Sequence, residues 1–140
     1  MPKKGPILII EDDFDDQELL KEVFEDLNIV NEIKFFESCI SVLEYLVTAI
    51  AKPFLIISDI NLPLMTGLEL KARINETECI RKKNIPFIFF TTNPGHTVVA
   101  EAFEMNAQGY FVKPSTLDGI KEVIRKIVDY WGTGLLPQQV

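Results

Sequence analysis

The sequence predicts an α/β fold in which five parallel strands alternate with five helices that cover both faces of the sheet. Short apolar runs such as Ile7–Ile10 and Phe54–Ser58 are typical of strands that are buried on both sides. Between these runs lie longer segments whose apolar residues recur at helical spacing. Because strands and helices alternate along the whole chain, one doubly covered parallel sheet is the expected architecture.

The first half of the chain contains three expected strands and two expected helices. The strands are Pro6–Ile10, Glu32–Phe36 and Phe54–Ser58. The first helix should be capped by Asp15 or Asp16 and the second by Ser38, since short polar side chains favour that position. Their apolar faces contain Leu19, Leu20, Val23, Phe24 and Leu27 in the first helix, and Ile40, Val42, Leu43, Leu46, Val47 and Ile50 in the second. Lys52 and Pro53 should end the second helix.

The second half contains three expected helices and two expected strands. A loop at 62–67 leads into a short helix at about 68–74. The next elements are a strand at Phe87–Phe90, a modest helix at His96–Met105 and a strand at Tyr110–Val112. Ser115 can cap a last helix that runs to about Trp131, with Asp118 completing a variant of the capping box.

Composition and charge exclude several classes of protein. The chain has 140 residues, a formal net charge of −7 and an isoelectric point of about 4.7. Such a surface lacks the basic patch that contacts with a phosphate backbone require, so DNA or RNA binding is disfavoured. No apolar segment approaches the roughly 18 residues of a membrane span, and the first residues lack the apolar stretch of a signal peptide. A cytoplasmic protein without a membrane partner is therefore expected.

Acidic side chains follow two of the expected strands. Glu11, Asp12 and Asp13 come directly after the first strand, and Asp59 follows the third. The ligand crevice of such sheets lies beyond the carboxyl ends of the strands, so these carboxylates are expected to meet there. A divalent cation such as Mg²⁺, which prefers oxygen ligands, would relieve their mutual repulsion. Asp13, together with the acids of the following turn, is expected to cap the helix or match its dipole rather than to bind metal.

Two further polar side chains follow strands at the same edge of the sheet. Thr91 comes after the fourth strand, and Lys113 comes after the fifth. A carboxylate can attack a phosphoryl group and form an acyl phosphate, and the transfer depends mainly on positioning and on neutralising the phosphoryl oxygens. The ammonium of Lys113 and the hydroxyl of Thr91 suit that task.

Four motifs, in this order and spacing, resemble the receiver domain of bacterial two-component response regulators. They are Ile-Ile-Glu-Asp-Asp at 9–13, Ser-Asp-Ile-Asn-Leu-Pro-Leu-Met-Thr-Gly at 58–67, Phe-Phe-Thr-Thr at 89–92 and Gly-Tyr-Phe-Val-Lys-Pro at 109–114. The resemblance implies a flavodoxin-like (βα)₅ fold with strand order 2-1-3-4-5. It also implies a single receiver domain over residues 1–140, with a core at about 5–131 and a tail at 132–140.

The resemblance assigns the acidic residues to phosphoryl acceptance and to metal binding. Asp59 matches the phosphoacceptor, and Glu11 and Asp12 match the acidic pair that holds Mg²⁺. Asp12 would bind the metal directly, and Glu11 would bind it directly or through water. Asp59 itself and the backbone carbonyl of Asn61 would complete the protein ligands.

The remaining assignments concern the switch. Lys113 matches the phosphate-binding lysine, Thr91 the switch hydroxyl and Tyr110 the aromatic switch residue. Phosphorylation is expected to draw Thr91 inward and to let Tyr110 turn toward the vacated space. The bond between Lys113 and Pro114 is expected to be cis, as is often the case in this family. Thr92 stands where many members have a smaller residue, so we expect it to restrict the access of water to the phosphoryl group.

The last expected helix carries a wide apolar arc that includes Val123, Ile127, Tyr130 and Trp131. Receivers in this family commonly pair through the face formed by the fourth helix, the fifth strand and the fifth helix, so a homodimer through these residues is one interpretation. The alternative is that the tail at 132–140 folds back and covers the arc.

The resemblance predicts a stand-alone response regulator rather than an enzyme in the usual sense. A sensor histidine kinase would transfer a phosphoryl group to Asp59 and so change the surface that a downstream protein target recognises. Its own chemistry would be limited to self-catalysed phosphoryl transfer and autodephosphorylation. The Asp-Ile-Asn-Leu-Pro stretch beginning at Asp59 and the Tyr130-Trp131 pair resemble small receivers that partner phytochrome-type kinases. Since the sequence ends soon after the last helix, no DNA-binding output domain is expected.

Three alternatives remain open on the sequence. A flavodoxin-like electron carrier would have to place a phosphate beside the acids at 11–13, which would repel it. A phosphatase of the haloacid-dehalogenase type would need a second aspartate where Asn61 stands. The third alternative is a receiver that binds its partner without phosphorylation; it would keep the fold and lack only the phosphoryl transfer.

Overall fold

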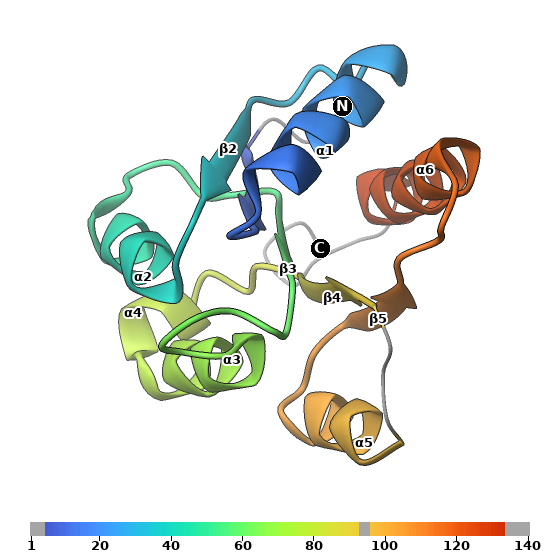
Figure 1. The fold of residues 1–140 in the computed structure, drawn as a ribbon. Helices are drawn as coiled ribbons and strands as arrows, with labels where there is room; N and C mark the ends of the chain where they lie inside the picture. The colour runs from blue at the N-terminus through green and yellow to red at the C-terminus, as the bar shows by residue number, and fades with distance from the viewer. Residues whose placement is uncertain (1–4, 93–95, 134–140) are drawn as a thin grey trace.

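The computed structural model describes residues 5–92 and 96–133 of the chain. Five parallel strands form one sheet in the order β2-β1-β3-β4-β5, as the resemblance implied (Figure 1). The strands are β1 (Ile7–Ile10), β2 (Ile33–Phe36), β3 (Leu55–Ser58), β4 (Phe87–Thr91) and β5 (Gly109–Val112). The helices are α1 (Phe14–Asp26), α2 (Cys39–Thr48), α3 (Gly67–Glu76), α4 (Glu78–Arg81), α5 (His96–Glu104) and α6 (Leu117–Thr133).

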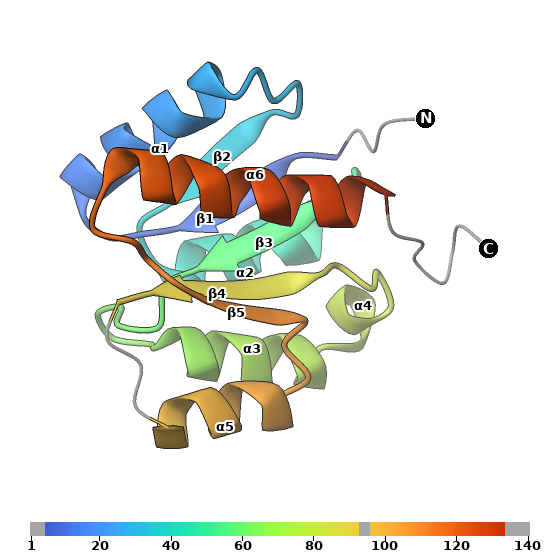
Figure 2. The same cartoon turned by 90° about the vertical axis from the view of Figure 1, so that its right-hand side faces the viewer.

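Helices cover both faces of the sheet, and each face has its own apolar core. Figure 2 shows α1 and α6 on one side and α2, α3 and α5 on the other. Alternate strand residues point to opposite faces, so Leu8 and Phe89 pack toward the α2–α3–α5 side while Ile9 and Phe90 pack toward α1 and α6. All residues of β1, β3 and β4 are buried, which explains why these strands read as continuous apolar runs.

The starts of two helices need comment. Among the three acids expected to cap α1 or to match its dipole, Asp13 is the cap rather than Asp15 or Asp16, because its side chain accepts a hydrogen bond from the backbone N–H of Asp16 at 3.1 Å. Thr116, not Ser115, precedes α6, and its Oγ1 accepts a hydrogen bond from the N–H of Gly119 at 3.0 Å. In both places several residues able to cap lie close together, and only the side-chain geometry selects one.

The helical segment after β3 is longer than predicted and is divided in two. Thr66 and Glu69 form a capping box at the start of α3, and α3 continues to Glu76. Thr77 then separates α3 from α4, a helix of 4 residues that the sequence did not predict. The expected helices four and five therefore correspond to α5 and α6.

No helix within the described ranges is long and apolar enough to cross a membrane. The predicted tail begins at Gly132, and its residues 134–140 lie outside the part of the chain that the structure describes. The alternative in which the tail covers the last helix therefore stays a prediction.

Candidate functional site

Adjacent parallel strands bring the first and third strand ends together. Ile10 of β1 is in register with Ser58 of β3, and the N–H of Asp59 donates to the carbonyl oxygen of Ile10 at 3.2 Å. Glu11 and Asp59 therefore leave the sheet side by side. This placement follows from the pairing of the two strands, and for Glu11 and Asp59 it confirms the expected meeting of acids at the carboxyl edge of the sheet.

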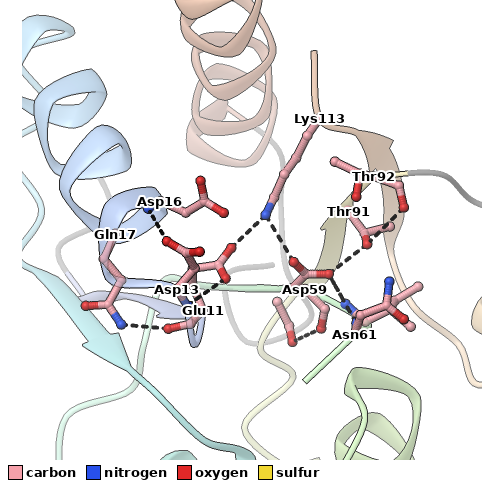
Figure 3. A network of polar contacts seen from close by, with 11 residues as sticks. Glu11, Asp13, Asp16, Gln17, Asp59, Asn61, Thr91, Thr92 and Lys113 are labelled. Carbon is pink, nitrogen blue, oxygen red and sulfur yellow. Dashed lines mark hydrogen bonds and ion pairs between the residues drawn. The ribbon is translucent and has the colours of Figure 1, made fainter. Parts of the chain in front are cut away.

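Lys113 lies between the two carboxylates (Figure 3). Its Nζ is 2.6 Å from Oε1 of Glu11 and 3.0 Å from Oδ2 of Asp59. All three side chains are largely buried, so solvent screens their interaction only weakly. The loop after β5 thus supplies one positive charge to two negative charges that come from β1 and β3.

The second oxygen of Asp59 accepts three hydrogen bonds. Its Oδ1 lies 2.6 Å from the N–H of Ile60, 3.2 Å from the N–H of Asn61 and 2.7 Å from Oγ1 of Thr91. Thr91 is buried at the end of β4, which is the neighbour of β3 in the sheet. Asp59 is therefore held at both oxygens, by a cation on one and by neutral donors on the other.

Burial and charge shift the pKa values of this cluster. Burial raises the pKa of Glu11 above its usual value, although the hydrogen bond and charge of Lys113 act in the opposite direction. Burial by itself would lower the pKa of Lys113, but the hydrogen bond to Glu11 and the charges of both carboxylates raise it. Lys113 therefore stays protonated at neutral pH and neutralises part of the negative charge.

The oxygen ligands at this edge suit a hard divalent cation, but they are not gathered around a metal position. Within residues 5–92 and 96–133, no group of three or more His, Cys, Asp or Glu residues is arranged to hold a metal ion. The carboxylate of Glu11 contacts Lys113, and the exposed Asp12 side chain makes no hydrogen bond or ion pair with the described residues. Metal binding would require these acids to turn toward Asp59.

Tyr110 lies beside the site on the edge strand β5. Its ring contacts that of Phe89 with the centroids 6.1 Å apart, and its hydroxyl is buried without a hydrogen-bond partner among the described residues. Burial raises the pKa of the hydroxyl, and the charge of Asp59 adds to that shift. The hydroxyl of Tyr110 is thus buried, and Thr91 contacts Asp59 directly. Both predicted switch residues therefore already face the interior of the protein.

Two sequence predictions differ from the geometry. The bond between Lys113 and Pro114 is trans, so the expected cis bond was wrong; even before proline, the trans form is the more stable. Ile127 belongs to the core between α6 and the sheet, so in the monomer it offers almost no surface to a partner. Val123 and Trp131 are half-buried, and Tyr130 is exposed.

Two further residues shape the site, although the sequence motifs assigned them no role. Gln17, in the first turns of α1, donates through Nε2 to the backbone oxygen of Glu11 at 2.6 Å and so anchors the acidic end of β1. Gly67 begins α3 so close to β3 that a Cβ atom there would lie 2.2 Å from the backbone oxygen of Asp59. The sequence did contain a signal for Gly67. It is a glycine that directly follows Thr66, a residue able to cap the helix after Asp59.

Comparison with known families assigns residues 7–125 to the response regulator receiver domain. The response regulator Rcp1 of Synechocystis is 26% identical over 130 residues, which cover 89% of this chain and 87% of that protein. The chemotaxis protein CheY of Pseudomonas aeruginosa is 28% identical over 130 residues, covering 88% of this chain and 95% of CheY.

Solved structures agree with the fold. The phosphorylated cyanobacterial phytochrome response regulator RcpA aligns with a TM-score of 0.85 and 22% identity, over 96% of this chain and 99% of RcpA. The Mn²⁺-bound form of Rcp1 aligns with a TM-score of 0.82 and 26% identity, over 95% of this chain and 99% of Rcp1. With the matching family model, the sheet order and the acid–lysine–threonine cluster, the chain belongs to the family of response regulator receiver domains.

Proposed function

We propose that this chain accepts a phosphoryl group on Asp59 from a sensor histidine kinase, in a reaction that depends on Mg²⁺. The P–N bond of a phosphohistidine on the kinase breaks, and a P–O bond to the Asp59 carboxylate forms. The product switches a protein-interaction surface and is later hydrolysed, so the chain acts as a phosphoacceptor and turns over no separate substrate. A cytoplasmic location fits such a kinase partner.

The observation that supports this proposal most strongly is the environment of Asp59. Its carboxylate lies between the ammonium of Lys113 at 3.0 Å and the hydroxyl of Thr91 at 2.7 Å. Phosphoryl transfer relies on groups of this kind to position and neutralise the phosphoryl oxygens. In the product, Lys113 and Thr91 would move their contacts from the carboxylate to the new phosphoryl oxygens.

The metal is proposed from the chemistry of the available oxygens. Asp12, Asp59 and the backbone carbonyl of Asn61 would bind Mg²⁺ directly, and Glu11 would do so directly or through a water molecule. The bound ion would supply positive charge to the transferring phosphoryl group. The Mn²⁺-bound structure of Rcp1, a relative at 26% identity, supports a divalent ion in this family.

The proposed output is a change on the surface formed by α5, β5 and α6. Thr91 ends β4 and Tyr110 lies on the neighbouring β5, so a movement of the hydroxyl of Thr91 would be transmitted directly to that surface. A homodimer and a downstream protein target are the proposed users of the surface. The similarity to Rcp1 and RcpA favours a phytochrome-type kinase as the phosphoryl donor.

The direct test is the intact mass of the protein after incubation with acetyl phosphate and Mg²⁺. We expect one phosphoryl increment in the native protein, none in Asp59→Asn and none when the metal is chelated. Asp15→Asn is the matched control, because Asp15 is an exposed acid of α1 that lies outside the cluster, and it should be phosphorylated normally. An increment that persists in Asp59→Asn would refute the assignment of the phosphoacceptor.

Two further assays, phosphate release from generic esters and incubation with a phosphorylated kinase, separate the alternatives. Continuous release of phosphate from generic esters would point to a phosphatase. The absence of an increment under every condition, including a kinase donor, would favour a receiver that binds its partner without phosphorylation.

A further inference from the structure

A cavity of about 590 Å³ lies at the end of the sheet opposite to Asp59. It is bounded by the second half of α3, by α4 and by the segments that lead into β4 and β5. Figure 2 shows α4 beside the start of β4, away from the loops that follow β1 and β3. The cavity volume falls in the range of about 300–1,000 Å³ that is usual for small-molecule sites.

The wall of the cavity is positively charged, although the chain as a whole is acidic. The lining consists of two cations, four side-chain amides and four apolar residues, which are Lys71, Arg81, Asn75, Asn84, Asn106, Gln108, Ile74, Ile80, Ile85 and Pro86. It includes no carboxylate, whereas the chain has 21 acidic and only 14 basic residues. A cavity of this composition is complementary to an anion.

Lys71 is the unusual member of this wall. It is only 6% exposed, its Nζ donates to Oδ1 of Asn75 at 2.9 Å, and it lies 5.7 Å from the centroid of the Phe87 ring. No carboxylate within the described ranges pairs with it. Burial of an ammonium is costly unless a negative charge compensates it, and here burial lowers the pKa of Lys71. An amide and an aromatic ring compensate the charge only in part.

The other polar groups hold the wall in place. Asn75 donates through Nδ2 to the backbone oxygen of Met105 at 2.9 Å, which ties α3 to the end of α5. Gln108 accepts from the N–H of Phe87 at 2.6 Å and donates to the oxygen of Asn106 at 2.9 Å. Arg81 is exposed, and its guanidinium makes one hydrogen bond within the described residues, a long one of 3.4 Å from Nη1 to the backbone oxygen of Asn75, which leaves most of its five donors available.

We propose that this cavity binds a small organic anion that carries a carboxylate or a phosphate monoester. The acidic group would contact the ammonium of Lys71 and the guanidinium of Arg81, which favours planar, bidentate binding of such groups. The organic part would lie against Ile74, Ile80 and Ile85. This site is separate from the phosphoacceptor cluster and does not depend on phosphorylation.

The proposal is tested by titrating the full-length, isotope-labelled protein and following backbone and side-chain amide signals by NMR. The probes are succinate and phenyl phosphate, with succinamide as the neutral isostere of succinate. We expect saturable shifts at Asn75, Asn106 and Gln108 with at least one anion, and none with succinamide. Shifts confined to the surroundings of Asp59 would mean that the anion binds at the phosphoacceptor site and would overturn the proposal.

Two variants and a control decide whether the charged wall is responsible. Lys71→Met and Arg81→Gln should each weaken binding at least tenfold, whereas Lys82→Gln, an exposed neighbour that does not line the cavity, should leave the affinity unchanged. If Lys71→Met fails to fold, Arg81→Gln on the surface still gives the answer. Equal affinity in the native protein and in Arg81→Gln, or no saturable shift with either anion, would refute the site.

Discussion

Among single residues, Tyr110 carries a polar side-chain atom that the described structure leaves unsatisfied. Its hydroxyl is buried without a hydrogen-bond partner there. A buried polar group that lacks a partner typically costs about 1–3 kcal/mol. The aromatic ring packs against Phe89, so phenylalanine would keep the packing and remove the cost.

We therefore expect Tyr110→Phe to raise the free energy of unfolding by about 1 kcal/mol in the unphosphorylated protein. Urea unfolding at neutral pH measures this difference. Tyr45→Phe serves as a control for loss of a hydroxyl elsewhere, since its ring packs against Phe36 on the other edge of the sheet. A clear loss of stability in Tyr110→Phe would show that the hydroxyl is bound, for example by an ordered water molecule.

Thr92 bears on how long the phosphorylated state lasts. It is exposed directly after Thr91, and its backbone oxygen lies 3.5 Å from the Oγ1 of that residue. If its side chain restricts the approach of water, Thr92→Ala should shorten the half-life of phosphorylated Asp59 roughly two- to fivefold, which corresponds to a barrier change of less than about 1 kcal/mol. Decay of the phosphorylated mass after removal of the donor gives the rate, and an unchanged half-life would contradict the prediction.

The polar residues of the site could be predicted from the sequence because each directly follows an expected strand. In a parallel sheet the carboxyl ends of the strands lie at one edge, so the residues that follow them lie together. Glu11, Asp59 and Lys113 could be brought to one edge on this argument alone. The burial of Ile127 could not be predicted in the same way, because a wide apolar arc on a helix does not show which of its residues meet the sheet. The unpaired hydroxyl of Tyr110 likewise depends on packing between distant residues.

Among the elements, α3 has the best-defined beginning. Oγ1 of Thr66 accepts from the N–H of Glu69 at 3.2 Å, and Oε1 of Glu69 accepts from the N–H of Thr66 at 3.3 Å. This reciprocal pair satisfies two backbone donors at the helix end. It also fixes where α3 starts relative to the loop that follows Asp59.

Loss of this cap should weaken α3 without changing its core face. We expect Thr66→Ala to lower the free energy of unfolding by about 1 kcal/mol. Glu69→Gln retains an acceptor at the same position of the capping box and should cost much less. Urea denaturation of the two variants gives the comparison, and equal losses in both would indicate that the charge of Glu69 contributes as much as the capping hydroxyl of Thr66.

The strands were easier to predict than the helix ends. Three fully buried strands are continuous apolar runs, and their observed limits differ from the predicted ones by about one residue. The start of α1 was predicted only to within three acids, because Asp13, Asp15 and Asp16 all favour a cap and the choice depends on one side-chain hydrogen bond. The helix α4 was missed because four residues are too few to show a helical period.

For the whole molecule, the edge of the sheet formed by β5 exposes apolar side chains. Figure 2 views the molecule from the side of β5, the edge strand, with α6 above it and α5 below it. Phe103 of α5, Val112 of β5 and Tyr130 of α6 are 54%, 50% and 67% exposed. Exposed apolar side chains on three adjacent elements favour an interface between proteins. This surface of α5, β5 and α6 is the same one that we propose to change on phosphorylation.

If this surface forms a homodimer, a charge at its most exposed aromatic position should weaken the association. Tyr130 contacts Trp131 edge-to-face and lines a hollow of about 270 Å³ with Phe111 and Lys126, so Tyr130→Asp would place a carboxylate where a partner has to pack. We expect the dissociation constant to rise at least tenfold, or about 1.4 kcal/mol. Light scattering after size-exclusion chromatography, over a range of concentrations and with or without acetyl phosphate and Mg²⁺, measures this change. Val30→Asp places the same charge at an exposed apolar residue after α1 and should have no effect. A protein that stays monomeric in both phosphorylation states would refute the homodimer and leave the downstream target as the proposed user of this surface.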